Sequence, residues 1–168
     1  AITKFLQTKP SDRSLVVRAL EALGNLKAAQ ATGPIAGYAA SADSEVRQHA
    51  LTALVRLGAD AALSHIPQLL DHASLPVRRS AVAALGMTKA AAAVPHLLKA
   101  FAVDETRAEA IGALASAPDS RALDAYLAGL SARDALLRLK CRQAVRQIRK
   151  ALLPEIERRM PDLAQEIL

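Results

Sequence analysis

The chain repeats one pattern of apolar and polar residues about every 30 positions, and within each copy the apolar residues have helical spacing. A clear copy runs from Pro76 to Gly86, and its Arg78 serves as the reference position. Equivalent positions are separated by 31, 31, 29 and 31 residues and are occupied, in chain order, by Val16, Arg47, Arg78, Arg107 and Arg138. Five matches at near-constant spacing predict five repeated units.

Small residues keep fixed places around this reference. Alanine stands six residues after it in every unit, and leucine or valine follows that alanine directly. The position three residues after the reference is occupied by Ala19, Ala50, Ala81, Ala110 and Cys141. These offsets, with the position just before the reference, lie on one face of an α-helix. Each segment is therefore predicted to be an amphipathic helix, helix A, whose alanines let neighbouring helices approach closely.

Residues that suit helix ends flank these segments. Three of the A helices are preceded by a residue whose side-chain oxygen can accept from the first backbone N–H groups: Asp43, Ser74 and Asp104. Glycines that suit a left-handed C-cap follow three of them, at Gly24, Gly58 and Gly86.

A second helix, helix B, is predicted in each unit. Prolines favoured in a first helical turn mark its start at Pro34, Pro67, Pro95 and Pro154, whereas the fourth unit offers Asp119 and Ser120 as caps. The predicted fold is an all-α solenoid of about five helix hairpins, at 11–41, 42–72, 73–102, 103–131 and 132–168, after a helical remnant at 1–10. Its B helices are expected to line the concave side, the usual binding surface of a solenoid.

The motif Val-Arg-x-x-Ala-x-x-Ala-Leu-Gly is complete from Val77 to Gly86 and partial from Val46 to Leu54. It resembles HEAT-like repeats of the phycobilisome-lyase type, and the resemblance covers about residues 11–160. It implies a right-handed superhelix. Such repeats serve adaptors, scaffolds, lyases and DNA-repair proteins, so the resemblance leaves the function open.

Composition agrees with close-packed helices. Hydrophobic residues make up 52% of the chain, many of them alanine, and there are two phenylalanines, two tyrosines and no tryptophan. No apolar run approaches the roughly 20 residues needed to cross a bilayer. The lone cysteine fits a reducing compartment and no secretory signal precedes the first helix, so we expect a cytoplasmic protein, and we also expect a monomer. The chain begins with Ala1, which suggests a processed protein or an excised piece of a longer one.

The arginines at the reference position have two interpretations. They would form a cationic track for phosphates or acidic peptides, or a structural ladder that pairs with loop carboxylates such as Asp43, Asp104 and Asp134. The ladder is favoured, because a residue repeated in every unit usually serves the stacking that every unit needs.

The net charge of +6 is concentrated near the end of the chain. Residues 133–150 contain seven basic residues and one acid, and 7 − 1 = 6, so the basic and acidic residues elsewhere cancel. A helical stripe of these residues is a candidate site for nucleic acid or an acidic partner, at Arg138, Arg142, Arg146, Arg149 and Lys150.

A structural explanation competes for the same stripe. Arg142 stands where the other units have Leu20, Leu51, Val82 and Ile111, and Arg146 stands where they have Gly24, Val55, Gly86 and Ala115. Apolar positions are expected to become polar at the end of a solenoid, where no further repeat covers them. The stripe then marks a C-terminal cap, whether or not it also binds an acidic partner.

Nothing else in the sequence proposes catalysis, a cofactor or a metal. The four histidines lack metal-ligand spacing, and Cys141 lies in the alanine column, which predicts a buried side chain rather than a reactive thiol or a chromophore attachment point. The leading hypothesis is a non-catalytic module that binds another protein on its B helices through Gln68, His96, Lys99, Asp124 and Tyr126. The aromatic residues of the B helices are expected to fill the core or to anchor a partner.

Overall fold

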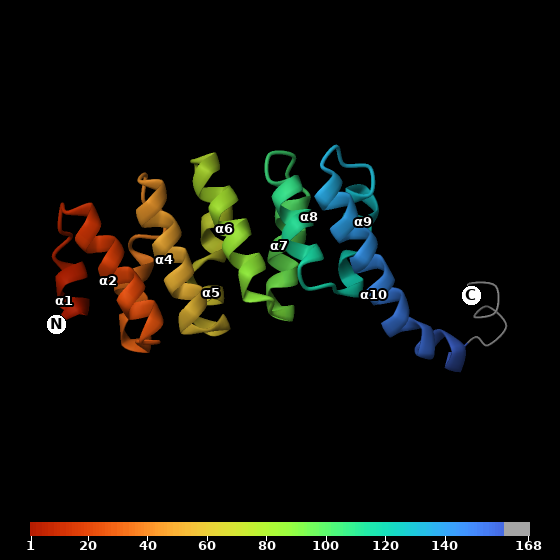
Figure 1. Ribbon diagram of the computed structural model, residues 1–168, viewed down its shortest axis with the longest axis horizontal. Helices are drawn as coiled ribbons and strands as arrows, with labels where there is room; N and C mark the ends of the chain where they lie inside the picture. The colour runs from red at the N-terminus through yellow and green to blue at the C-terminus, as the bar shows by residue number, and fades with distance from the viewer. Residues whose placement is uncertain (160–168) are drawn as a thin grey trace.

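The computed structural model describes the backbone of residues 1–159 and the side chains of residues 1–150. Within that range the chain is helical and contains no strand. The A helices are α2 (Arg13–Asn25), α4 (Ser44–Leu57), α6 (Leu75–Thr88), α8 (Arg107–Ala115) and α10 (Ala135–Arg159). Figure 1 shows them side by side in an elongated stack, each packed on the next.

The second layer is built from shorter elements. Each B element combines a 3-10 turn with a brief α-helix: η1 (Ala29–Ala31) with α3 (Thr32–Ala36), α5 (Ala59–His65) with η2 (Pro67–Asp71), η3 (Ala91–Ala93) with α7 (Val94–Phe101), and η4 (Ser120–Ala122) with α9 (Leu123–Gly129). Before them, α1 (Ile2–Gln7) packs against α2 and α3. The predicted all-α solenoid of helix hairpins is therefore confirmed.

The last helix differs from the prediction. A turn was expected near Pro154, but α10 continues through this residue to Arg159 and has 25 residues, against 14 in α4. Proline lacks the N–H that would bond four residues back, which weakens or bends a helix without necessarily ending it. No second helix of this unit lies within residues 1–159, and the rest of the predicted unit falls outside the described residues.

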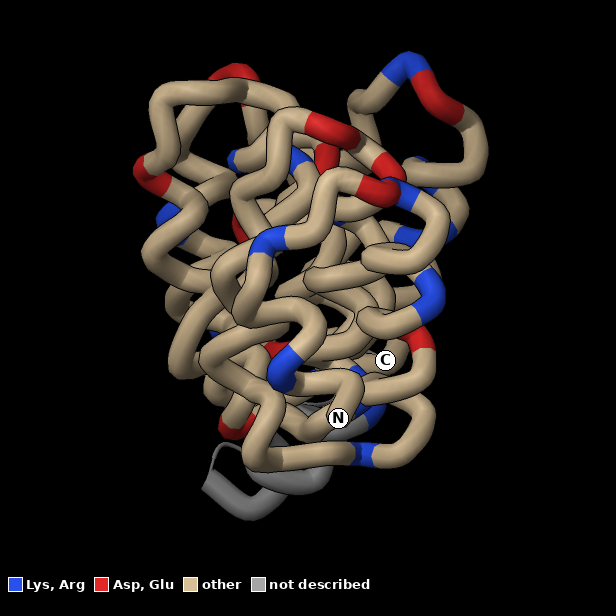
Figure 2. The backbone as a smooth tube through the Cα atoms, turned by 90° about the vertical axis from the view of Figure 1, so that its left-hand side faces the viewer, with Lys and Arg blue, Asp and Glu red and all other residues tan. Residues whose placement is uncertain are grey.

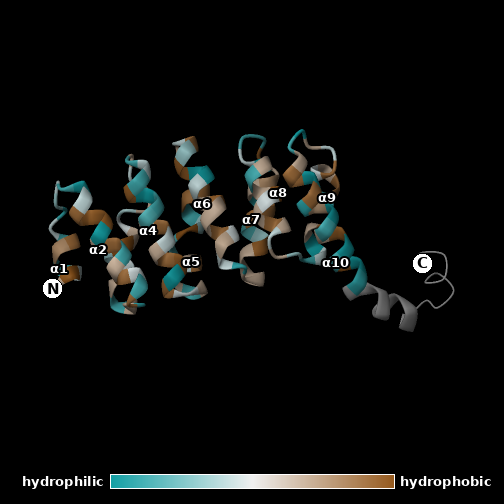
Figure 3. Ribbon diagram, viewed as in Figure 1, coloured by the Kyte–Doolittle hydropathy of each residue, from teal (hydrophilic) through white to brown (hydrophobic). Residues whose placement is uncertain are grey.

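The alanine-lined faces form the core, as the periodicity predicts. Ala50, Ala81, Ala110 and Cys141 are each 0% exposed, so the column three residues after the reference is fully buried in these units. Apolar residues face the inside of the stack, and polar residues alternate with them along each A helix (Figure 3). Within the described range, no helix is both long enough and apolar enough to cross a membrane.

The predicted N-caps are only partly correct. Asp43 caps α4, because its carboxylate accepts from the N–H groups of Glu45 and Val46. Ser74 holds the N-cap position of α6 without a side-chain bond, and α8 is preceded by Thr106 rather than by Asp104. The Thr106 hydroxyl instead donates to the carbonyl of Ala100 at 2.8 Å, which ties the end of α7 to the start of α8.

The predicted glycine C-caps need a larger correction. Gly24 and Gly86 lie inside α2 and α6, where the absence of a side chain allows the next A helix to approach. A Cβ placed on Gly86 would lie 2.6 Å from the Cβ and 3.0 Å from the Cα of Ala113. Gly58 is a C-cap, with φ +129° and ψ 168°, so it has positive φ without being in the left-handed helical region.

Lysine takes the corresponding turn position in two other units. Lys27 and Lys89 stand eleven residues after their references, as Gly58 does, and have φ angles of 48° and 51°. Positive φ at this position is thus a feature of the turn in all three units. The sequence does not predict the positive φ at Lys27 and Lys89, because lysine does not favour this conformation.

Candidate functional site

Arginines at the reference position hold the turns that lead into the A helices. In Arg78, Nη1 donates to the carbonyls of His72 at 3.0 Å and Ala73 at 3.1 Å, six and five residues earlier. Arg138 repeats the geometry, with bonds of 2.7 Å and 2.8 Å to the carbonyls six and five residues before it. We call this arrangement the arginine clasp.

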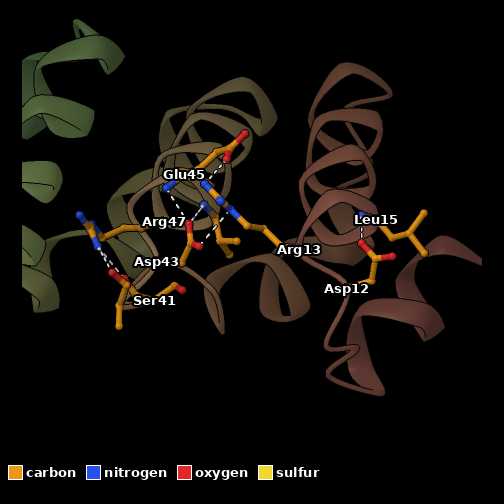
Figure 4. A network of polar contacts seen from close by, with 9 residues as sticks. Asp12, Arg13, Leu15, Ser41, Asp43, Glu45 and Arg47 are labelled. Carbon is orange, nitrogen blue, oxygen red and sulfur yellow. Dashed lines mark hydrogen bonds and ion pairs between the residues drawn. The ribbon is translucent and has the colours of Figure 1, made fainter.

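The Arg47 clasp is the most deeply buried. Its side chain is only 6% exposed, and Nη1 donates to the carbonyls of Ser41 at 2.6 Å and Ala42 at 3.3 Å. Its Nε donates to the Ser80 hydroxyl of the next unit at 3.0 Å. Figure 4 shows Arg47 directed toward Ser41, on the other side of α4 from the Arg13 contacts. The guanidinium thus closes one turn and connects two units.

The arginine ladder is therefore real, but its main partners differ from the prediction. Backbone carbonyls replace the expected carboxylates in most clasps, since a guanidinium presents several N–H donors in one plane and satisfies two carbonyls at once. Arg107 combines both kinds of partner: Nε donates to the Phe101 carbonyl at 3.1 Å, and Nη2 lies 2.6 Å from the Asp104 carboxylate. The structural interpretation replaces the cationic track.

Ion pairs cross from one unit to the next at the surface. Arg13 contacts both Asp43, at 3.0 Å, and Glu45, and Arg79 lies 3.1 Å from Glu109. Many of the carboxylates lie at the edge formed by the turns before the A helices, where Figure 2 shows Asp and Glu gathered at the top. Exposed pairs of this kind each contribute about 0–1 kcal/mol, so they supplement the buried clasps.

The predicted partner-binding residues lie on the B elements with different exposures. Gln68, Lys99 and Asp124 are exposed, and His96 is half-buried. The Lys99 Nζ lies 2.7 Å from the Asp71 carboxylate, so an ion pair joins the B elements of two neighbouring units.

Tyr126 does not belong to that surface. It is 0% exposed, and its hydroxyl oxygen accepts from the Asp119 N–H at 3.0 Å and lies 3.2 Å from the Leu114 carbonyl oxygen. Burial raises the pKa of this hydroxyl above its ordinary value. Tyr126 therefore fills the core rather than anchoring a partner, because its side chain points from α9 toward α8.

The two other B-element aromatics are only partly buried. The Tyr38 hydroxyl donates to the Leu6 carbonyl at 2.8 Å, which attaches α3 to α1. The Arg107 guanidinium lies over the Phe101 ring, with 5.8 Å between the Arg107 Cζ and the centre of the ring. Both side chains are engaged in contacts within the fold.

The basic stripe divides into two parts. Arg138 is occupied by its clasp, whereas Arg142, Arg146, Arg149 and Lys150 are exposed on α10. Cys141, on the buried face of the same helix, is 0% exposed, and burial raises the pKa of its thiol. A buried thiol with a raised pKa agrees with a packing role, because the thiolate is the reactive form.

A surface that the sequence analysis missed lies between the A helices. Shallow grooves follow the junctions of α2 with α4, α4 with α6, and α6 with α8. The groove between α4 and α6 is lined by Gln48, Thr52, Ala83 and the exposed Met87, among others. The signal available in the sequence is the small residue five positions after the reference in three units: Thr52, Ala83 and Gly112.

No described part of the fold assembles a metal site: residues 1–150 contain no group of three or more His, Cys, Asp or Glu side chains placed to hold an ion. The fold is a framework whose turns are held by arginine clasps, and it offers three kinds of surface. These are the B elements, the grooves between A helices, and the two ends of the stack.

The stacked hairpins define an α-solenoid repeat protein, and the comparisons with known proteins name its family. The model for HEAT repeats matches residues 2–86 and 35–106, which together span more than half of the chain. The chain belongs to the HEAT repeat family. A search of curated protein sequences gave no match.

Solved structures share this fold at low sequence identity. The complex of CpcE and CpcF of phycocyanin lyase from Nostoc sp. PCC7120 contains a chain with a TM-score of 0.65 and 18% identity, over 94% of this chain and 70% of that one. An engineered protein matches with a TM-score of 0.54 and 17% identity, over 98% and 92%. Human deoxyhypusine hydroxylase matches with a TM-score of 0.53 and 21% identity, over 86% and 61%.

Proposed function

We propose that this chain is a non-catalytic scaffold that binds a partner protein on the surface of its B elements. The proposal rests on one observation: the polar side chains fall into a group that bonds within the fold and a group that stays exposed. Arg47, Arg78 and Arg138 are turned back onto the chain's own turns, whereas Gln68, Lys99 and Asp124 stay exposed on successive B elements. A rigid framework that presents an ordered polar surface suits recognition, because little conformational freedom is lost on binding.

The structural relatives support this kind of role. CpcE and CpcF form a complex with each other, as the name of that structure states. A chain with a similar fold therefore contacts another protein in that case. We extend only the general property, protein–protein contact, to the present chain.

The test begins with partner capture by the full chain. The variant Gln68→Ala/Lys99→Ala/Asp124→Ala is expected to lose the captured partner while unfolding at nearly the same temperature as the parent. The matched control, Gln48→Ala/Thr52→Ala/Ser116→Ala, alters the grooves between the A helices instead. If the first variant still binds the partner and the control does not, the proposal is wrong and the binding surface lies on the A helices.

Nucleic-acid binding by Arg138, Arg142, Arg146, Arg149 and Lys150 stays a prediction. The exposure of Arg142 and Arg146 favours it, and the clasp of Arg138 removes one of its five cations. Binding through phosphates would weaken steeply with added salt. It is one outcome of the experiment described next.

A further inference from the structure

Toward the C-terminal end of the stack, α9 and α10 expose positions that are more buried in earlier units. Val94 begins α7 and is 4% exposed, and both α8 and η4 of the next unit pack against α7. Leu123 begins α9 in the same way and is 42% exposed, and Leu127, one turn later, is 48% exposed. Two leucines of the last described B element thus face solvent on the side where the next B element would lie.

The same change occurs on α10. Arg142 stands in the column whose interior members Leu51, Val82 and Ile111 are 3%, 0% and 5% exposed. Arg146 stands in the column of Gly86, where the next A helix makes close contact. Both arginines are exposed, so the side of α10 that would face another unit is cationic rather than apolar.

We group five exposed residues of the adjacent elements α9 and α10 as the C-terminal end face: Leu123, Leu127, Leu139, Arg142 and Arg146. Leu139 is 50% exposed and lies three residues before Arg142 on the same helical stripe. Among residues 1–150, neither Arg142 nor Arg146 has a hydrogen-bond or ion-pair partner. The face combines an apolar strip on α9 with the guanidinium groups of Arg142 and Arg146 on α10.

We propose that the C-terminal end face docks an acidic amphipathic helix of a partner protein. The geometry of the stack suits a helix, because every interior A helix and B element receives helical elements of the following unit on this side. The charge selects an acidic one: apolar residues of the incoming helix would contact Leu123 and Leu127, and its carboxylates would pair with Arg142 and Arg146. Gln68 and Lys99 lie on earlier units, and Asp124 adjoins Leu123 at the margin of this face. The inference therefore rests on Leu123, Leu127, Arg142 and Arg146 and not on the B-element proposal.

A second copy of the chain fits this face less well. In a head-to-tail contact, another copy would join through the opposite end of the stack, which has an apolar patch lined by Ile2, Phe5 and Leu15 together with the cationic Arg18. The residues that line this patch include no carboxylate that could pair with Arg142 and Arg146. Like charges at the centre of a contact disfavour it.

Nucleic acid also fits less well. Phosphates would pair with the arginines but leave Leu123, Leu127 and Leu139 exposed beside them. Base stacking on single strands uses aromatic side chains, and this face has none. The leucines therefore favour a peptide partner and provide the means of telling the two apart.

The experiment measures binding of two labelled synthetic peptides to the full chain by fluorescence anisotropy. One peptide is helical, with leucines at positions i, i+3, i+4 and i+7 flanked by glutamates; the other has the same composition in an order that breaks its apolar face. The first is expected to bind at least about tenfold more tightly. Either double variant, Leu123→Ser/Leu127→Ser or Arg142→Glu/Arg146→Glu, is expected to weaken its binding by at least about tenfold.

The control variant Lys4→Glu/Arg18→Glu makes the same change in net charge at the other end of the stack. It should alter binding less than about twofold at physiological ionic strength, because distant surface charges are screened. Thermal unfolding of every variant verifies the fold. Each variant is also tested with a 20-base-pair DNA duplex.

Several results would overturn the proposal. Equal affinity for both peptides would mean that only charge matters. Tight binding of the duplex that depends on the arginines but not on the leucines would make the face a nucleic-acid site. A lowered unfolding temperature in Leu123→Ser/Leu127→Ser, with no effect on peptide binding, would mean that the chain's own residues cover the leucines.

Discussion

Arg47 on α4 reaches Ser80 on α6 across the boundary between two units, with Nε donating to the hydroxyl oxygen at 3.0 Å. That hydroxyl in turn donates to the carbonyl of Pro76 at 2.8 Å. The same guanidinium bonds the turn before its own helix. One buried cation thus links the turn of one unit to the first turn of the next A helix.

Replacing Arg47 with alanine should therefore destabilise the fold strongly. The carbonyls of Ser41 and Ala42 would lose a buried donor, and we expect a loss of about 2–4 kcal/mol in the free energy of unfolding. Arg107→Ala removes a clasp whose arginine side chain is 45% exposed. Its loss should stay near or below about 1 kcal/mol. Urea titration measures both, and equal losses would contradict the ranking.

Gly86→Ala tests the close approach of α6 and α8. The added methyl would overlap Ala113, so we expect a loss of about 1–3 kcal/mol despite the better helix propensity of alanine. Gly112→Ala is the matched control, since its Cβ would lie 3.7 Å from Leu137 in ordinary contact. The control should be neutral or gain up to about 1 kcal/mol. Loss of stability in both variants would indicate that contact distance is not the cause.

Enlarging the alanine seam should also destabilise the fold. Ala81 and Ala84 are 0% and 3% exposed, and leucine at either position should cost about 1–3 kcal/mol by overpacking. Ala83→Leu, on the exposed side of the same helix, should be close to neutral. Denaturant titration of the three variants checks the assignment of faces, which would be wrong if Ala83→Leu were the most harmful.

Asp119 should make stability depend on pH in the acid range. Its hydrogen bond with the Arg121 side chain lowers the pKa of Asp119 from 3.8 to about 2. A lowered folded-state pKa stabilises the fold above the unfolded value, and this contribution disappears as the pH falls from about 4 to 2.

The variant Asp119→Asn should accordingly unfold at a lower temperature than the parent at neutral pH. The difference should shrink toward pH 2. Thermal unfolding followed across this range measures it, with Asp60→Asn, an exposed carboxylate on α5, as the control for loss of one negative charge. A difference that stays constant with pH would contradict the role of the carboxylate charge.

Lys89 offers a route to higher stability. A non-glycine residue in the left-handed region costs about 1–2 kcal/mol, and Lys89 has φ 51°. Lys89→Gly should therefore raise the free energy of unfolding by roughly 0.5–1 kcal/mol after the entropy of glycine in the unfolded chain is counted. Lys89→Ala removes the charge but keeps the strain, so an equal gain there would attribute the effect to charge.

The sequence predicts the A helices and their packing faces well, because burial on one side of a helix produces a regular spacing of apolar residues. Ala50 and Ala81 lie where their spacing places them. Periodicity reports which way a side chain points but less well how deep it lies, so Tyr126 was grouped with surface residues although it is fully buried.

The polar contacts were less predictable for a different reason. The clasps of Arg47 and Arg78 use backbone carbonyls, which every residue has and no sequence pattern marks. Turn geometry was hidden in the same way at Lys89, where the turn imposes a conformation that lysine does not favour. At Pro154 the local signal for a new helix was outweighed by the helical run on both sides.

The arginine clasp also bears on how such a chain can grow. Because the arginine and the carbonyls it holds lie within six residues of one another, a duplicated gene segment would carry its own turn-closing device into the new copy. In the clasps of Arg47, Arg78 and Arg138, the arginine places little constraint on the loop side chains, since backbone carbonyls accept its bonds. In units that have the arginine, selection on that one codon would help to keep a newly copied hairpin shaped for its neighbours.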